Sequence, residues 1–452
     1  MSSNSSIYQE KSFTSNSELT LDQDKKAHKF IIKFAWLMVG GMFLDGFVLG
    51  YIGALMPSIT ADLGLSNQAQ GAIGAATLIG IFFGSPIGGY LADRFGRKPM
   101  FFIDLLLFLV CSIGQFFATD AYTLFVMRLF MGIAIGIEYA VAWPMLAEFA
   151  SPKMRGRLLA LTETGWYVGY SASFGLSYLM VENHIAHWNV ILALSAIPSC
   201  ILLILRRGMP ESPRWLMSKG RKAEAMQIAR KYMAKAEQQD VLHQKHHALG
   251  KNPSFFDLFS PKNIKGVSLY SIYFLGTAAP YFSISAFIPM VLQSLGIKDG
   301  VLGGLLLNTV AIFGTIAAAF LVDRFSRRTM AILPFVISTI ALSIVALSSN
   351  SPTLILISFL VYSFVNAVNA GVLCILPGEL IRPEISGLGT GFAAAVSRAG
   401  AAFGVFLMPI LISAYGVELV VWIAVVICLF TTVVLHKYMP ETKGKSMSEI
   451  FN

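Results

Sequence analysis

The sequence predicts an all-α membrane protein in which twelve transmembrane helices form two pseudo-symmetric six-helix bundles. The first observation is composition: 55% of the 452 residues are hydrophobic and 13% are charged, with a mean hydropathy of +0.66. A soluble domain carries about 25% charged residues, so most of this chain cannot face water. The second observation is an internal repeat, and the third is a one-sided distribution of basic residues between the apolar segments.

The apolar pattern places six spans within 30–206 and six more within 263–438. Each is about 17–30 residues long, which is enough to cross a hydrocarbon core of about 30 Å. The polar segments are an N-terminal tail (1–29), a central loop (207–262) and a C-terminal tail (439–452). The spans are centred near residues 43, 80, 108, 134, 169, 197, 278, 311, 339, 365, 400 and 427.

The repeat relates the two sets of spans at an offset of 230 residues. Gly-Tyr-Leu-Ala-Asp-Arg-Phe-Gly-Arg at 89–97 returns as Ala-Phe-Leu-Val-Asp-Arg-Phe-Ser-Arg at 319–327. Pro-Glu-Ser at 210–212 returns as Pro-Glu-Thr at 440–442. The repeat indicates that the chain consists of two homologous halves. Internal repeats of this kind are typical of secondary transporters.

The formal net charge of +9 reflects membrane topology rather than binding of nucleic acid. If the N-terminus is cytoplasmic, Lys298 is the only basic residue in an external loop, and Arg128 and Arg398 lie within spans. All other Lys and Arg then fall in cytoplasmic loops, tails or adjoining span ends. This asymmetry predicts a multi-pass protein of the plasma (inner) membrane with both termini in the cytoplasm.

The sequence gives no sign of an enzyme, a metal site or a cofactor. All four cysteines lie inside apolar runs without a Cys-x-x-Cys pair, and the histidines form no cluster. The central loop of about 55 residues is small for a catalytic domain and contains no phosphate loop or nucleophile motif. The polar N-terminus is expected to be a tail and not a cleaved signal peptide.

Five ionisable residues are predicted to lie well inside spans, where each costs about 2.5–3.5 kcal/mol on insertion scales. Asp45 lies about 22 Å from the cytoplasmic end of the first span, and Arg128 about 9 Å from the outer end of the fourth. These depths are similar, so the two are expected to pair, either as a proton-coupling pair or as a permanent structural ion pair. The other three are Glu138, Glu163 and Arg398, and either glutamate is an alternative proton carrier.

Glu163 begins a stripe on one helical face that continues with Trp166, Tyr167 and Tyr170. An acid beside aromatic rings suits the wall of a substrate cavity, although such a stripe also suits helix packing. Arg398 is expected near the midplane, where its guanidinium could hold a carboxylate or phosphate, or could neutralise Glu138 or Glu163. Weaker candidates for neutral substrate contacts are Asn308, Asn366, Asn369, Tyr273 and Tyr281.

The block at 89–98, its copy at 319–328 and the Pro-Glu motifs resemble signatures of the major facilitator superfamily. Pro-Glu-Ser-Pro-Arg-Trp at 210–215 is similar to the sugar-porter and metabolite:proton symporter branches. The resemblance implies the fold of that superfamily, with ion-pair clusters between helix ends that hold the cytoplasmic side closed and break when the transporter faces inward. The alternative for these charges is simple topological anchoring. The gate residues so implied are Asp93, Arg94, Arg97, Glu148, Arg155, Arg157, Asp323, Arg324, Arg327, Glu379 and Arg382.

Motifs in the fourth and eleventh predicted spans indicate which branch of the superfamily the chain resembles. Ser397-Arg398-Ala-Gly is similar to organic-ion, nicotinate and other metabolite transporters, and Gly-Ile-Glu138-Tyr139 resembles a stretch of phosphate and metabolite:proton symporters. An acid in the first span with Arg128 in the fourth resembles the proton-coupling pair of proton-linked sugar porters.

These observations predict a secondary active transporter that takes up a small polar metabolite with protons by alternating access. An organic acid is favoured over a neutral substrate because three acids and an arginine are expected within the membrane. The alternative is a sugar or polyol transporter, by proton symport or facilitated diffusion, and a nutrient sensor is less favoured. The expected partners are the substrate, protons and membrane lipids, without nucleic acid, and the chain is expected to be a monomer.

Overall fold

A computed structural model describes residues 4–234, 238, 254–321, 324–348, 351–382 and 385–442 of the chain. The regular elements in these ranges are all helices, as the sequence predicts. Asp323, part of the central loop and the C-terminal tail beyond residue 442 lie outside the described residues.

The first half contains seven helices, which carry the predicted spans 1 to 6. They are α1 (Asn4–Leu63), α2 (Asn67–Phe95), α3 (Arg97–Phe116), α4 (Ala121–Phe149), α5 (Pro152–Glu182), α6 (Trp188–Ala193) and α7 (Ala196–Leu205). The central loop contains α8 (Pro213–Ser218), α9 (Lys222–Tyr232) and the short 3-10 helix η2 (Phe255–Phe259).

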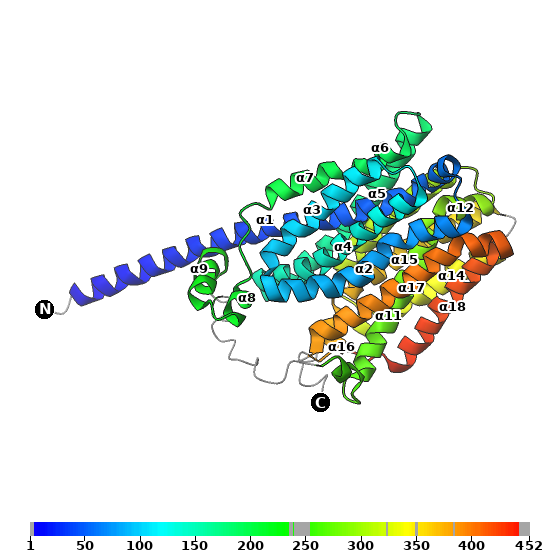
Figure 1. Cartoon of the computed structure of the whole chain (residues 1–452). Coiled ribbons are helices and arrows are strands. Elements are labelled where there is room, and N and C mark those ends of the chain that lie inside the picture. The colour runs from blue at the N-terminus through cyan, green and yellow to red at the C-terminus, as the bar shows by residue number, and fades with distance from the viewer. Residues whose placement is uncertain are drawn as a thin grey trace.

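The second half repeats this order after the central loop. Its helices are α11 (Ile264–Ala286), α12 (Ile288–Ser294), α13 (Gly300–Leu321), α14 (Arg327–Leu347), α15 (Pro352–Leu373), α16 (Leu376–Leu380), α17 (Ser386–Tyr415) and α18 (Val417–Tyr438). Figure 1 shows the blue-to-green helices as one bundle and the lime-to-red helices as a second bundle alongside it.

Ten helices within the described ranges are long and apolar enough to cross a membrane, with Trp188–Leu205 counted as one. Helices α11 and α12 meet at an angle of 74°, and they form an eleventh span of this kind if they are counted as one. The remaining predicted span is the fifth along the chain and corresponds to α5. This helix has 31 residues but is not apolar enough to be counted among these spans. The polar residues Thr162, Ser173 and Ser177 of this helix are buried, because α5 packs against α1 and α13 inside the bundle.

The turn between α2 and α3 differs from its repeat in the second half. Gly96 has φ +103°, a conformation that favours glycine, and its backbone N–H bonds to Ala92 O. The corresponding residue Ser326 has φ −67° and caps α14, because its Oγ accepts the N–H of Thr329. The repeat therefore keeps the turn and changes the way in which the next helix begins.

Small residues let helices approach closely within the first half. Gly80 and Gly84 on α2 face Gly132 and Gly136 on α4, and these positions leave no room for side chains. A Cβ at Gly80 would overlap the carbonyl oxygen of Leu129. Close backbone approach at small residues is a common way for helices to associate in a membrane, and it fixes α4 against α2 here.

The two halves meet along α2 and α17 and along α5 and α13. Several of these contacts lie at the ends remote from α8 and α9. The hydroxyl of Tyr178 on α5 donates to Asp299 Oδ2, before α13, at 2.9 Å. Gly53 on α1 lies close to the carbonyl oxygen of Ser285, and Gly71 on α2 lies against the backbone of Phe406. The halves are therefore joined tightly at this end.

We predict that Gly80→Ala lowers the free energy of unfolding by about 1–3 kcal/mol, because overpacking forces α2 away from α4. The thermal unfolding midpoint of the purified protein in detergent measures this effect. Gly89→Ala is the matched control on the same helix, since a Cβ there meets nothing within 4 Å. Equal midpoints for the two variants would contradict the close α2–α4 approach.

Candidate functional site

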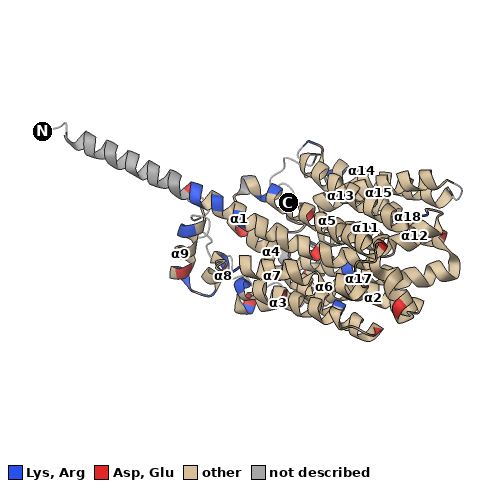
Figure 2. Cartoon of the chain, turned by 90° about the horizontal axis from the view of Figure 1, so that it is seen from above, with Lys and Arg blue, Asp and Glu red and all other residues tan. Residues whose placement is uncertain are grey.

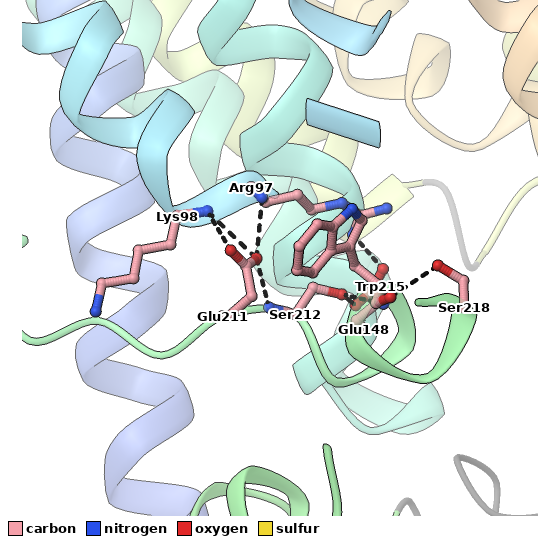
Figure 3. A network of polar contacts seen from close by, with 7 residues as sticks. All are labelled: Arg97, Lys98, Glu148, Glu211, Ser212, Trp215 and Ser218. Carbon is pink, nitrogen blue, oxygen red and sulfur yellow. Dashed lines mark hydrogen bonds and ion pairs between the residues drawn. The ribbon is translucent and has the colours of Figure 1, made fainter. Parts of the chain in front are cut away.

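The predicted gate residue Arg97 belongs to a compact network at one end of the first half (Figure 3). Arg97 Nη1 forms a short ion pair with Glu148 Oε1 at the end of α4, and Ser212 Oγ donates to the other oxygen of Glu148. Glu211 accepts the backbone N–H of Arg97 at 2.9 Å and of Lys98 at 3.1 Å. A carboxylate at the start of α3 is favoured there by the exposed N–H groups and the helix dipole.

The second half repeats this network at the offset found in the sequence. Arg327 Nε donates to Glu379 Oε1 at 3.0 Å, and Thr442 Oγ1 donates to the other oxygen of Glu379. Glu441 accepts the backbone N–H of Arg327 at 3.0 Å. We call these two networks the N-terminal clamp (Arg97, Glu148, Glu211 and Ser212) and the C-terminal clamp (Arg327, Glu379, Glu441 and Thr442). Each clamp joins helix ends of its own half.

The other predicted gate residues within the described part of the chain lie near the same helix ends, and Asp323 is outside that part. Arg94 Nη1 donates to Tyr90 Oη at 3.3 Å, and Asp93 contributes its backbone oxygen to Trp215 Nε1 at 2.9 Å. Arg155 is half-buried beside Ala150 O, and Arg157 is exposed. Arg324 and Arg382 also make interactions in the second half. The sequence did not single out Glu211, Ser212, Glu441 and Thr442, although the repeated Pro-Glu motifs marked them.

The expected pairing of Asp45 with Arg128 is wrong in this structure. Both side chains are fully buried, but neither oxygen of Asp45 has a hydrogen-bond partner, and both terminal nitrogens of Arg128 are also unpartnered. Arg128 Nε donates to Ile73 O at 3.2 Å, and its guanidinium lies over the ring of Tyr51 at 5.8 Å. Similar depth placed the two residues at one level but could not fix the direction in which each side chain points.

Glu138 has a partner that the sequence did not predict. Arg206, at the end of α7, donates to both oxygens of Glu138 at 2.5 and 2.7 Å. Asp104 on α3 lies 3.5 Å from the same guanidinium, and both partners are buried. By sequence, Arg206 is one of the basic residues at span ends, and Asp104 was not among the five charges predicted inside spans. We call Asp104, Glu138 and Arg206 the buried triad.

Arg398 lies among aromatic rings rather than carboxylates. Its guanidinium is 5.0 Å from the ring of Phe282 and 5.6 Å from that of Phe274 in its own half. It is also 5.7 Å from the ring of Tyr139 on α4, in the other half. Within the part of the chain that the structure describes, no carboxylate lies within 4 Å of Arg398. Of the two predicted alternatives, direct pairing of Arg398 with Glu138 or Glu163 is therefore not observed.

The predicted stripe on α5 meets α11 across the boundary between the halves. The ring of Tyr281 lies 5.9 Å from that of Tyr167 and 6.2–6.3 Å from those of Trp166 and Tyr170. Glu163 faces the second half as well, since Cys374 Sγ lies 3.8 Å from Glu163 Oε1. Thus these residues from the two halves gather in one central region.

The neutral candidates lie in the second half, and two of them line a small cavity. Tyr281 Oη donates to Asn308 Oδ1 at 3.3 Å, and Tyr273 Oη donates to Asn369 Oδ1 at 3.2 Å. Asn366 is buried on the same helix as Asn369. Tyr281 and Asn308 face a cavity of about 10 Å³, which also has polar lining from Ser285, Tyr362 and Ser363. This volume holds about one water molecule, so a larger ligand requires rearrangement of the residues around the cavity.

Comparison with known proteins agrees with this architecture. The model of the sugar (and other) transporter family matches residues 33–452 of the chain. The chain is 32% identical over 422 residues to the inner membrane metabolite transport protein YgcS of Escherichia coli, covering 93% of this chain and 94% of that protein. It is 26% identical to the glucose transporter GlcP of Staphylococcus epidermidis, covering 94% and 97% of the two chains.

Among solved structures, the fold matches the proton:xylose symporter XylE of Escherichia coli bound to 6-bromo-6-deoxy-D-glucose. The TM-score is 0.79 at 23% sequence identity, with 94% of this chain and 98% of that chain covered. The match supports the fold of the major facilitator superfamily. The chain is therefore a multi-pass membrane transporter of small metabolites or sugars, and it belongs to the sugar (and other) transporter family.

Proposed function

We propose that this chain is a proton-coupled symporter that takes up a small organic acid across the plasma (inner) membrane. The observation that carries the substrate class is Arg398, which is 8% exposed and is surrounded by three aromatic rings without a carboxylate partner in the described residues. A buried guanidinium that makes no direct ion pair is costly in a medium of low dielectric constant, so an anion that contacts it directly is favoured there. A carboxylate matches its fork of donors.

The aromatic residues support recognition of a small molecule at the same place. Trp166, Tyr167 and Tyr170 come from one half, and Tyr281 and Phe282 from the other, so their rings form a wall that both halves share. In this proposal Arg398 holds the anionic group of the substrate and the rings cover its apolar part. Glu163 adds selectivity, since its ionised form would repel a second negative charge.

Asp45 is the acid to which we assign proton coupling. It is fully buried and both of its oxygens lack hydrogen-bond donors. An isolated carboxylate in such a place is costly, whereas the protonated form is neutral, so proton binding and release change the stability of this conformation. Glu163 is a second candidate, while Glu138 is already held by Arg206. Arg128 acts in this proposal by binding helix α2 through Ile73 O.

The charges and the relatives support the proposed orientation. Figure 2 shows Lys and Arg side by side around α8, α9 and the inner end of α1, and the basic residues of α8 and α9 belong to the central loop. An excess of basic residues marks cytoplasmic loops. Both termini would then be cytoplasmic, in an inner membrane such as the one named for the relative YgcS.

A neutral sugar or polyol is the second candidate substrate. The observation in its favour is the small cavity lined by Tyr281, Asn308, Tyr362 and Ser363, whose hydroxyl and amide groups suit the hydroxyls of a sugar. Relatives named as glucose transporters agree with this alternative. In this reading Arg398 would contact the substrate weakly or not at all.

We propose that the two clamps keep the helix ends of each half together as the halves move during alternating access. Each clamp lies within one half, so a rigid-body rotation of one half against the other leaves its bonds intact. The bonds that must break are those across the boundary, such as Tyr178 to Asp299 at the outer end.

The coupling role of Asp45 can be tested in proteoliposomes. We expect Asp45→Asn to abolish substrate accumulation driven by a pH gradient while counterflow exchange continues, because an amide cannot bind or release the proton. Asp62→Asn is the matched control, since Asp62 lies at the outer end of the same helix and bonds to Trp188. Gradient-driven accumulation that persists in Asp45→Asn would rule out this role.

The anion-binding role of Arg398 can be tested with a thermal-shift screen of small carboxylates, phosphate, sugars and polyols. We expect one or more carboxylates to stabilise the unmodified protein and Arg398→Gln to weaken that binding by about tenfold or more, since a charge-assisted bond is lost. Arg128→Gln is the control for loss of a buried guanidinium elsewhere. If Arg398→Gln binds the carboxylate as tightly as the unmodified protein, or if only sugars stabilise both, the organic-acid proposal fails.

The independence of the two clamps predicts additive effects on stability. We expect Glu211→Gln and Glu441→Gln each to lower the free energy of unfolding by about 1 kcal/mol, because each loses a charge at a helix N-terminus. The double variant should lose the sum of the two, since the sites lie in different halves. Denaturant or thermal unfolding of the purified variants measures this, and a clearly non-additive double variant would show that the clamps act on each other.

A further inference from the structure

The buried triad combines two carboxyl groups with one guanidinium. Arg206 holds Glu138 in a bidentate ion pair, and its Nη1 lies 3.5 Å from Asp104 Oδ2. Asp104 Oδ1 accepts the backbone N–H of Leu105 at 2.6 Å, while Asp104 Oδ2 is buried and accepts no hydrogen bond. The carboxyl groups of Asp104 and Glu138 therefore meet at the same Nη1 atom of Arg206.

Four helices enclose this cluster and keep it from water. Asp104 comes from α3, Glu138 from α4 and Arg206 from the end of α7, and all three are at most 1% exposed. Helix α1 closes the fourth side: its Leu37 O accepts from Arg206 Nη2 at 3.4 Å, and a Cβ at Gly41 would overlap both Arg206 and Glu138. The ring of Phe101 covers the guanidinium at 4.8 Å.

The charges on the surrounding helices do not balance the second carboxylate. Asp45 lies one turn beyond Gly41 on the same face of α1, and it is an acid. Glu163 on α5 and Arg398 on α17 are the next ionisable groups that act on this region, and they carry opposite charges. Thus the triad with both acids ionised has a net charge of −1, and the Asp45 carboxyl on α1 can only add negative charge to it.

We propose that Asp104 and Glu138 share one proton, so that the first half contains a proton-binding site apart from the substrate region. The O–H of one carboxyl donates to an oxygen of the other, and this bond uses the Asp104 oxygen that otherwise has no partner. The proton leaves the triad electrically neutral in a region of low dielectric constant. Two carboxyl groups that contact one guanidinium titrate as a pair and hold a proton that neither would hold beside Arg206 alone.

The site is independent of the proposed symport, because a facilitator with the same triad would hold the same proton. Its consequence for a symporter is electrostatic. Loss of the shared proton leaves a negative charge near Asp45, which favours a proton on Asp45 instead. Protonation of the pair and protonation of Asp45 therefore affect each other.

Infrared spectroscopy of the protein reconstituted in lipid tests this inference without any substrate. The C=O stretching band of a protonated carboxyl is separate from the bands of carboxylates. Labelling aspartate with ¹³C shifts the part of this band that comes from aspartate side chains and so identifies it. We expect Asp104→Asn to remove one protonated-carboxyl equivalent at neutral pH, because Glu138 is then balanced by Arg206. Glu138→Gln should also remove one equivalent, because Asp104 is then the single acid beside Arg206.

The double variant Asp104→Asn with Glu138→Gln distinguishes a shared proton from two separate ones. A shared proton predicts that the double variant loses one equivalent, as each single variant does. Losses that add to two equivalents, or a single substitution that removes no protonated-carboxyl intensity, would overturn the proposal. If Asp104→Asn does not fold, Glu138→Gln with ¹³C-labelled aspartate still decides: the lost band must carry an aspartate contribution if the proton is shared, and none if it resides on Glu138 alone.

Glu224→Gln is the matched control for these spectra. Glu224 lies on α9 outside the membrane, and hydrogen bonds from Arg221 lower the pKa of its carboxyl. It is therefore ionised at neutral pH, and its substitution should leave the protonated-carboxyl band unchanged. A transport assay in the same liposomes keeps the two proposals apart: a shared proton with no pH-driven accumulation would reject symport and retain the triad.

Discussion

Four helices of the first half meet around one buried guanidinium, that of Arg206, and the arrangement of charge in the bundle depends on this contact. An ionised side chain costs about 2.5–3.5 kcal/mol on insertion, so a bundle tolerates several only where they compensate one another. Arg206 compensates Glu138 fully and Asp104 in part. Because Gly41 leaves space for these groups against α1, the cluster also fixes how α1, which carries Asp45, sits in the bundle.

The internal repeat separates what the two halves share from what they do not. The clamps recur bond for bond, with the backbone N–H of Arg97 on Glu211 and that of Arg327 on Glu441. The buried triad does not recur, since a shift of 230 residues from Asp104, Glu138 and Arg206 reaches Pro334, Val368 and His436. Shared helix-end bonds suit two halves that move as bodies, and the unshared charges suit functions that only one half performs.

Much of the fold could be predicted from sequence because it depends on signals along the chain. Span length, basic loops and the repeat required no knowledge of which face of a helix a residue occupies. The charged site depends on that knowledge, so the expected pairing of Asp45 with Arg128 was wrong although the depth estimate was reasonable. Asp104 was not predicted to be a buried charge, because it lies only two turns from the basic start of α3. Neighbouring helices nevertheless bury it completely. Burial inside a bundle is set by those neighbours, which no single segment reveals.

The central claim of this account is that transport moves protons together with the substrate. The most direct measurement is the external pH of a lightly buffered suspension of proteoliposomes when a carboxylate that the protein binds is added, with potassium and valinomycin to clamp the membrane potential. The account predicts an immediate alkaline shift that a protonophore abolishes and that liposomes without protein do not show. Entry of the substrate without any change in external pH would contradict it.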